Sequence, residues 1–526
     1  MTESAPSAEV RLSSPGGKWI LASTILASSM AFIDSTALNV ILPSLQNDLQ
    51  ADGTDIFWIL NAYLLMLASL ILVGGSLGDK LGRRKVFMVG IIVFMVGSAA
   101  CGFAPSVTWL IGSRAVQGIG GALMIPGSLS IISSTFHRKE KGKAIGTWSA
   151  VTTLVTVGGP ILGGALGDAG LWRAIFFINL PIGLASLFVL FWKVPESYDE
   201  SLNHRLDYAG AISVVIGLAL VTFGFLEIPE LGWSHWKVLG SLVIGGLSLV
   251  GFVRVEQVKE NPMVPLGLFN NKTFTGANLL TFLLYAALAV GMLFLTLNMV
   301  QIQGYRQVQA GMTLLPFTIL LASLARWVGG LVDRYGARWL LVSGSILAGF
   351  GFLWFSTVGL TKGPEEFWTT FFPGIILFGL GMSLTVVPLT TTVMAAVADQ
   401  HSGTASGINN AMTRTANVLA NATVGALAVV LFSNFLDPII HSLTLDENAR
   451  LAVMQQANNL GDARVPETVP SAEHERIKLA YQQSFIAMFN QLMYISAGLA
   501  SLSALVAFFL IQKPQDPEVI PIPIKE

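Results

Sequence analysis

The sequence predicts an all-α integral membrane protein with fourteen transmembrane helices, and three observations support this class. Of the 526 residues, 53% are hydrophobic, only 12% are charged, and the mean hydropathy is +0.66. Soluble chains carry about 25% charged residues. The charges gather in short clusters between apolar runs that are long enough to cross a bilayer. Glycine, with 53 residues, is enriched, as in closely packed membrane helices.

Fourteen runs are long and apolar enough to be spanning helices. In chain order they cover residues 19–44, 56–78, 86–104, 107–133, 144–167, 174–192, 208–226, 236–253, 274–302, 309–332, 339–360, 367–396, 404–434 and 485–511. Several contain Gly or Pro, which membrane helices tolerate when neighbours satisfy the freed backbone groups. The first run is too long for the apolar core of a cleaved signal peptide, so no cleavage is expected.

Basic residues between the runs predict the orientation in the membrane. An even number of spans places both termini on one side, and most Lys and Arg residues of the connecting segments fall on that side. Because cytoplasmic loops are enriched in Lys and Arg, we expect both termini to be cytoplasmic. The expected location is the cell (plasma or inner) membrane, with multiple passes.

A repeated motif predicts two related halves. The segments GSLGDKLGRR (75–84) and GGLVDRYGAR (329–338) share Gly, Leu, Asp, a basic residue, Gly and Arg at equal spacing. Each follows a span, so the simplest arrangement is two six-helix halves around a two-helix insert, or 6+2+6. The expected units are a tail at 1–18, a half at 19–195, the insert at 196–262, a half at 263–512 with an extracellular loop at 435–484, and a tail at 513–526.

The repeated motif carries charges that can form exchangeable ion pairs. Asp79 precedes three consecutive basic residues, and the glycines allow close packing and a tight turn. Such pairs would stabilise one arrangement of the two halves and separate in the other. The alternative is a basic loop that only fixes orientation. The candidate latch residues are Gly75, Asp79, Gly82, Arg83, Arg84, Asp333, Arg334 and Arg338.

Asp34 is an acid near the middle of the first apolar run. Ionisable residues in membrane spans are costly and are functional by default. Asp34 is therefore a candidate proton carrier, or a counter-ion for a cationic substrate. Arg114, inside the fourth run, is its candidate partner, since no other acid lies as deep in a span. The alternatives are a permanent structural pair, a bond from Asp34 to a neighbour such as Asn39, or an Arg114 bound to backbone carbonyls.

A polar stripe marks the thirteenth run. Asn410, Arg414, Asn417 and Asn421 recur at spacings of four, three and four, which places them on one helical face. Such a face avoids lipid, so it lines a cavity or forms a static seam between helices. The candidate substrate-binding residues are Phe32, Asn39, Trp58, Tyr63, Arg326, Asn410, Arg414, Asn417 and Asn421. The aromatic members also fit a simple packing role.

Five segments resemble motifs of the major facilitator superfamily. Residues 75–84 resemble its signature loop, LIGSRAVQGIGGALMIP (110–126) its fourth-helix motif, and VTVGGPILGGALG (155–167) its fifth-helix antiporter motif. DSTALNVILP (34–43) and WRAIFFINLPIG (172–183) are similar to segments of the fourteen-span drug:proton antiporters of the EmrB/QacA type. The residues that carry the antiporter motif are Gly158, Gly159, Pro160, Gly163 and Gly164.

The resemblance implies a proton-coupled antiporter that exports amphipathic or lipophilic compounds by alternating access, as in multidrug efflux and antibiotic resistance. Its implied partners are protons, a small-molecule substrate and the lipid bilayer, and it is expected to be a monomer that uses no cofactor, metal, ATP or nucleic acid. Arg326 stands where many relatives are uncharged. If it faces the pore, it disfavours cationic substrates.

Other functions remain open at this point. Within the same fold, the chain could be a dedicated exporter of a lipid, siderophore or metabolite. An antiporter-like subunit of an ion pump would carry intramembrane Lys residues, and no Lys lies deep in any span. An enzyme is not expected, because no cluster of His, Cys and acidic residues is apparent and Cys101 is the single cysteine.

Overall fold

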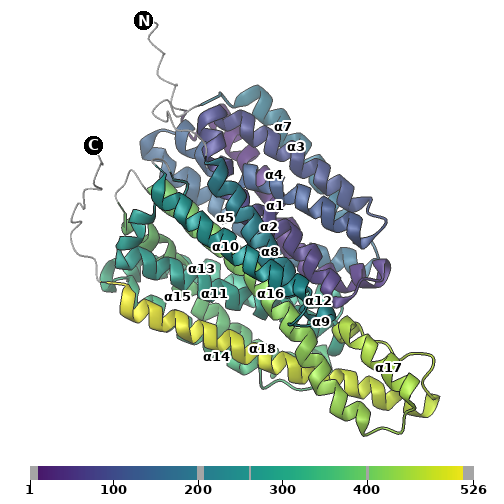
Figure 1. Ribbon diagram of the computed structural model, residues 1–526. Helices are drawn as coiled ribbons and strands as arrows, with labels where there is room; N and C mark the ends of the chain where they lie inside the picture. The colour runs from purple at the N-terminus through teal and green to yellow at the C-terminus, as the bar shows by residue number, and fades with distance from the viewer. Residues whose placement is uncertain (1–9, 198–206, 260–261, 398–401, 513–526) are drawn as a thin grey trace, which may run out of the picture.

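The computed structural model describes residues 10–197, 207–259, 262–397 and 402–512 (Figure 1). In this part of the chain, 14 helices are long and apolar enough to span a membrane. They run roughly side by side in one elongated bundle (Figure 1). The prediction of an all-helical membrane protein with fourteen spans is confirmed.

The helices fall into three consecutive sets. The first holds α1 (Pro15–Leu49), α2 (Gly53–Leu81), α3 (Arg83–Gly102), α4 (Val107–Thr135), α5 (Arg138–Asp168), α6 (Ala174–Phe177) and α7 (Asn179–Lys193). The second holds α8 (Tyr208–Leu226), α9 (Ile228–Leu231) and α10 (Trp236–Val258). The third holds α11 (Lys272–Leu297), α12 (Gln307–Thr313), α13 (Leu315–Tyr335), α14 (Ala337–Phe355), α15 (Phe371–Ala395), α16 (Ser402–His441), α17 (Glu447–Gln455) and α18 (His474–Leu510).

Local sequence signals fix where the first helices begin. The side chain of Ser14 accepts a hydrogen bond from the Gly17 N–H, and Pro15 occupies the first helical position of α1. At the start of α2, Asp52 and Asp55 each accept the other's backbone N–H in a capping box. These caps satisfy backbone donors that the helices themselves leave unpaired.

The two copies of the repeated motif share one backbone feature. Gly82 lies between α2 and α3 with φ of 109°, and Gly336 lies between α13 and α14 with φ of 77°. Residues with a Cβ rarely adopt these angles, so the position favours glycine. The second glycine of the motif therefore ends one spanning helix and starts the next with a single residue between them.

The last two spans are longer than predicted. Helix α16 continues to His441 and α18 begins at His474, so the loop between them is shorter than the expected 435–484. The extension of α18 packs on α16: the rings of Phe432 and Tyr481 stack with centroids 6.4 Å apart. The Tyr481 hydroxyl also donates to the carbonyl of Val453 in α17 at 3.2 Å.

The bundle has two distinguishable ends. Helix α1 begins at the upper left of Figure 1 and α18 ends at the left of the same view; we name this end of the bundle the terminal end, and α17 lies at the opposite, loop end. At the loop end the Asp168 carboxylate accepts the N–H groups of Gln307 and Val308 at 2.8 and 3.1 Å. Gln301 donates to Gln46 at 3.0 Å. These bonds join the first and third sets of helices at this end.

The second set forms a helical pair on the side of the bundle. Helix α8 packs against α10 and also against α2 and α16, so it contacts both other sets. Trp58 of α2 meets Phe223 of α8 with ring centroids 6.1 Å apart. The pair therefore lies across the boundary between the first and third sets.

Candidate functional site: a buried ion pair and a polar stripe

Asp34 lies on α1 in the interior of the first set of helices. Its side chain is 0% exposed, and Arg114 of α4 is 1% exposed. Arg114 Nη1 donates to Asp34 Oδ2 at 2.5 Å. The structure thus brings together the two charged residues that the sequence singled out from separate spans.

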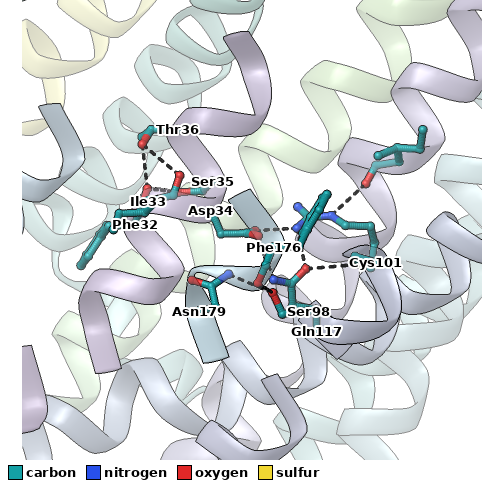
Figure 2. Close-up of polar contacts among 12 residues, drawn as sticks. Phe32, Ile33, Asp34, Ser35, Thr36, Ser98, Cys101, Gln117, Phe176 and Asn179 are labelled. Carbon is teal, nitrogen blue, oxygen red and sulfur yellow. Dashed lines mark hydrogen bonds and ion pairs between the residues drawn. The ribbon is translucent and has the colours of Figure 1, made fainter. Parts of the chain in front are cut away.

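Gln117, one turn after Arg114 on α4, completes the pair. Its Nε2 donates to Asp34 Oδ1 at 2.8 Å, and its Oε1 accepts from Arg114 Nη1 at 2.7 Å (Figure 2). Both oxygens of the carboxylate therefore have a donor. A buried charge needs this degree of pairing, because desolvation is costly in a membrane interior.

The guanidinium of Arg114 is held on its other faces as well. Its Nε reaches the Ile59 carbonyl at 3.5 Å, and its Cζ lies 4.4 Å from the centre of the Tyr63 ring. Both contacts come from α2. Tyr63, a predicted substrate-binding residue, is buried against Arg114. Its side chain therefore has little accessible surface with which to contact a substrate.

The arrangement can bind and release a proton with a large local effect. With Asp34 ionised, its charge is balanced by Arg114. When Asp34 is protonated, Arg114 becomes an uncompensated buried cation, which is unfavourable unless another anion, a carbonyl or water replaces the carboxylate. A change of charge at Asp34 would therefore weaken the contact that this pair makes between α1 and α4.

The glycines of helix α5 permit two close helix contacts. A Cβ at Gly163 would lie 2.7 Å from the Ala37 carbonyl oxygen of α1, and one at Gly159 would meet the Thr36 hydroxyl. On the other face a Cβ at Gly164 would lie 2.5 Å from the Gln307 carbonyl oxygen of α12. Small residues are needed where helix backbones approach this closely.

Pro160 and Gly158 differ in their surroundings. The Pro160 carbonyl oxygen lies 2.4 Å from where a Cβ on Gly311 of α12 would stand, so it belongs to the contact between the first and third sets. A Cβ at Gly158 would meet nothing within 4 Å. Four of the five antiporter-motif residues therefore lie at tight interfaces, and a gating role for them stays a prediction.

The polar stripe of α16 carries hydrogen-bonding atoms without partners. Asn417 Oδ1, Asn421 Oδ1 and Arg414 Nε are buried and have no hydrogen bond in the described structure. Asn410, at the terminal end of the stripe, is exposed and donates to the Ser406 carbonyl at 3.0 Å. In a static seam each polar atom would be satisfied, so the unpartnered atoms favour a stripe that lines a cavity, and that role stays a prediction.

Asn409 forms such a seam on another face of α16. Its Nδ2 donates to Thr281 Oγ1 at 2.7 Å and to Asn278 Oδ1 at 3.2 Å, both on α11. Its neighbour Asn410 has no part in these contacts. Adjacent asparagines thus differ in role because they point to different helical faces.

The first signature loop is anchored within the first set of helices. Asp79 Oδ1 lies 2.8 Å from Arg83 Nε, and Arg84 Nη1 donates to the Val194 carbonyl at 2.8 Å. Glu196 Oε1 accepts the Arg84 N–H at 2.9 Å. Asp79 and Arg83 are therefore paired with each other, and Arg84 contacts the segment that directly follows α7. Their role as a latch between halves stays a prediction.

Two glycines shape this loop. A Cβ at Gly82 would lie 2.7 Å from the carboxyl carbon of Glu196, whereas one at Gly75 would make an ordinary contact with Pro126 at 3.7 Å. Gly82 thus lets the Glu196 carboxylate approach the loop backbone. Sequence reasoning missed Glu196, since nothing in the motif indicates an acid more than a hundred positions away.

Aromatic rings contact the two arginines of the second signature loop. The Arg338 guanidinium lies 4.7 Å from the centre of the Phe508 ring of α18, and Arg334 lies 5.3 Å from that of Tyr335. Guanidinium groups stack favourably on aromatic faces. The side chain of Asp333 lies outside the described residues, so the pairing predicted for it is not described.

The remaining candidates are scattered. Phe32 lies edge-on to Trp148 with centroids 6.4 Å apart, and Asn39 is half-buried farther along α1. Trp58 packs on the helical pair of the second set, as described above. Arg326 belongs to α13, but its side chain lies outside the described residues, so the direction in which it points is not described.

Two residues of the site escaped the sequence analysis. Gln117 could have been found, because it follows Arg114 at helical spacing and shares its face. Asn61 of α2 is fully buried, and both of its side-chain polar atoms lack partners. Helices α2 and α16 run antiparallel, with Phe57 beside Gly425 and Leu72 beside Gly407. Asn61 of α2 therefore lies at about the same height in the bundle as Asn421 of α16.

Comparison with known proteins identifies relatives that match most of the chain. Residues 24–421 match the family described as Major Facilitator Superfamily. The Multidrug resistance protein Stp of Mycobacterium tuberculosis is 33% identical over 80% of this chain and 77% of its own length. The Tetracenomycin C resistance and export protein of Streptomyces glaucescens is 29% identical over 94% and 92%. The Multidrug transporter protein MdtP of Bacillus subtilis is 30% identical over 71% and 68%.

Solved structures share the fold. A bacterial homologue of the human lysosomal transporter Spinster, in an inward-facing and unoccupied conformation, aligns with a TM-score of 0.64 at 18% identity, covering 96% of this chain and 100% of its own. A D-xylose–proton symporter aligns with a TM-score of 0.57 at 14% identity, covering 94% and 98%. These likenesses support the helical architecture and carry no information on substrate.

Proposed function

Because the chain belongs to the Major Facilitator Superfamily, and is thus a multi-pass membrane transporter of small molecules and not an enzyme, we propose that it is a proton-coupled antiporter that exports amphipathic or lipophilic compounds. The observation that carries the proposal is the buried Asp34–Arg114 pair. An acid at membrane depth whose charge is balanced by one cation has two well-defined states, and coupling requires such a change of charge.

Proton and substrate are linked through the same helices. The Tyr63 ring lies against Arg114, and helix α2, which carries Tyr63, packs against α16, which carries the polar stripe. A substrate that bonds to the unpartnered atoms of α16 would therefore act close to the ion pair. Competition between substrate binding and Asp34 protonation would give exchange by alternating access.

The proposal includes an orientation and a division of the chain. We place both termini in the cytoplasm, on the strength of the Lys and Arg distribution. We also divide the chain into halves at 19–195 and 263–512 with the insert at 196–262. The positive φ that Gly82 and Gly336 share, each as the single residue between two spanning helices, supports this division.

The names of the relatives support an exported toxic compound as substrate. Stp and MdtP are described as multidrug proteins, and a third relative is named for resistance to, and export of, one compound, tetracenomycin C. The last description keeps a dedicated exporter of one metabolite as the second candidate. A panel of unrelated compounds separates the two, because a dedicated exporter responds to one chemical class.

The test uses purified protein in liposomes with an imposed pH gradient. We expect a panel of amphipathic compounds to be moved against their concentration gradients while the pH gradient lasts. Collapse of the gradient by a protonophore should stop the transport, and addition of substrate to detergent-solubilised protein should release protons. Transport that continues undiminished without a pH gradient would contradict proton coupling.

A further inference from the structure

The terminal end of the second set of helices contains a buried pair of carboxyl groups. Asp207 caps the start of α8: its Oδ1 accepts the Gly210 N–H at 2.8 Å and pairs with Lys259. Glu256 lies in the last turn of α10, where its Oε2 accepts the Val264 N–H at 2.8 Å. The two acids are 5% and 3% exposed.

Each acid has one oxygen left over, and the two leftover oxygens face each other. Asp207 Oδ2 and Glu256 Oε1 are buried without a donor in the described structure. Each lies 2.7 Å from the position that a Cβ on Gly210 would occupy, so the two oxygens approach the same point beside the first turn of α8. Two buried carboxylates that approach the same point repel strongly when both are ionised.

Lys259 balances only one of the two negative charges. The described charged groups that act on the pair are the two acids themselves and Lys259. Arg254, a further cation of α10, is exposed and donates to Gln257 at 3.3 Å. With both acids ionised, the buried cluster would hold an uncompensated negative charge next to an unsatisfied oxygen, which is costly.

The two acids differ in their bonding, which decides where a proton resides. Burial raises the pKa of Asp207, but the hydrogen bonds from Lys259 and the Gly210 N–H outweigh this and leave its pKa below the usual value. Glu256 receives a single backbone N–H. Asp207 is therefore the anion, and the Glu256 oxygen that faces it is the site for a proton.

We propose that Asp207 and Glu256 form a proton-binding clasp, in which a proton on Glu256 Oε1 bonds to Asp207 Oδ2. The clasp connects the first turn of α8, the last turn of α10 and the segment that leads to α11. When the proton leaves to solvent, the two carboxylates repel each other. The Glu256 side chain then moves away from Asp207, and this movement breaks its hydrogen bond with the Val264 N–H. The clasp is a proton site separate from Asp34, and it does not depend on the proposed transport function.

Hydrogen–deuterium exchange of the full-length protein in detergent tests the clasp. In the wild type, the amide of Val264 should be protected at mildly acidic pH. Its protection should fall at least about tenfold at mildly alkaline pH, after correction for the exchange rate of an unstructured peptide. Glu256→Gln should keep the protection at both pH values. The Gln amide can donate to Asp207 while its oxygen accepts from Val264, which copies the protonated acid.

Matched variants make the result specific. Glu475→Gln, at an exposed acid of α18, should retain the wild-type pH dependence. Gly210→Ala should lower the protection at both pH values, since the added Cβ would stand 2.7 Å from both leftover oxygens. If the wild type and Glu256→Gln show the same pH dependence, the proposal is overturned.

Infrared spectroscopy gives a second readout that does not depend on exchange. The wild type should show the absorption of a protonated carboxyl group that disappears at alkaline pH and is missing in Glu256→Gln. A bound metal cation is the competing occupant. Protection of Val264 that followed the Na⁺ or K⁺ concentration at constant pH, with no protonated carboxyl signal, would reject the proton clasp in favour of that cation.

Discussion

The first and third sets of helices place different chemistry at the centre of the bundle. In the first set, Asp34, Arg114 and Gln117 form a charged cluster in which each oxygen of the carboxylate has a donor. In the third set, the α16 stripe offers amide oxygens of Asn417 and Asn421 that have none. The two sets of helices therefore differ in whether their buried polar atoms have hydrogen-bond partners.

The difference suggests a division of labour. A charge cluster whose carboxylate oxygens all have donors stabilises one arrangement of its helices until its charge changes. This behaviour suits a proton switch. Unsatisfied amide oxygens in a buried site remain available to water or a ligand. The first set is the candidate proton site, and the third set is the candidate recognition surface.

The largest effect is expected at the proton site. Asp34→Asn keeps the shape of the side chain but holds it neutral at every pH. Gradient-driven export should fall to the level of protein-free liposomes, and substrate-induced proton release should vanish. Binding of uncharged ligands should remain, measured by the quenching of tryptophan fluorescence. The protein should still insert and purify, because Gln117 can continue to bond to residue 34.

A conservative change provides the control for that result. Asp34→Glu retains an acid and should keep part of the activity with a displaced pH optimum. Wild-type accumulation by Asp34→Asn would remove the proton-carrier role and leave Asp34 as a structural partner of Arg114. The first set of helices would then no longer differ from the third set by containing a proton site.

The next effect concerns stability of the charge cluster. Gln117→Leu removes the donor to Asp34 Oδ1 and an acceptor for Arg114, and it leaves both buried charges short of a partner. The expected loss in free energy of unfolding is about 1–3 kcal/mol. It would be measured by thermal unfolding in detergent, with Gln483→Leu at an exposed position of α18 as the control. Equal stability of the two variants would show that the cluster tolerates an unsatisfied carboxylate.

The signature loops allow the two sets to be compared at equivalent positions. Gly82→Ala and Gly336→Ala each place a Cβ on a positive φ, which costs about 1–3 kcal/mol. At Gly82 the Cβ also meets the Glu196 carboxylate. We therefore expect the Gly82 variant to have the lower melting temperature. The reverse order would mean that the Glu196 anchor yields easily, as expected of a latch that opens.

The sequence was sufficient for the class, the number of spans and the charged pair. Apolar runs report membrane helices directly, and Asp34 and Arg114 are conspicuous because charges are rare at that depth. Helix ends at the loop end were not predictable, since α16 and α18 extend by packing on each other. Glu196 and the Asp207–Glu256 pair depend on contacts between distant segments, which no local pattern reports.

The smallest expected effect tests the recognition surface. Asn421→Leu exchanges a buried amide, whose oxygen lacks a partner, for an apolar side chain of similar size. Replacing an unsatisfied polar group by an apolar one is near neutral or stabilising, so the melting temperature should not fall. If substrate bonds to this amide, its apparent affinity should drop by about 1 kcal/mol, or about fivefold.

Asn410→Leu, at the exposed end of the stripe, should leave the affinity unchanged. Proton release should keep its wild-type pH dependence in both variants, because Asp34 and Arg114 are untouched. A loss of stability in Asn421→Leu without a change in affinity would instead make the α16 stripe a structural seam, and the contrast with the charged cluster would be one of packing alone.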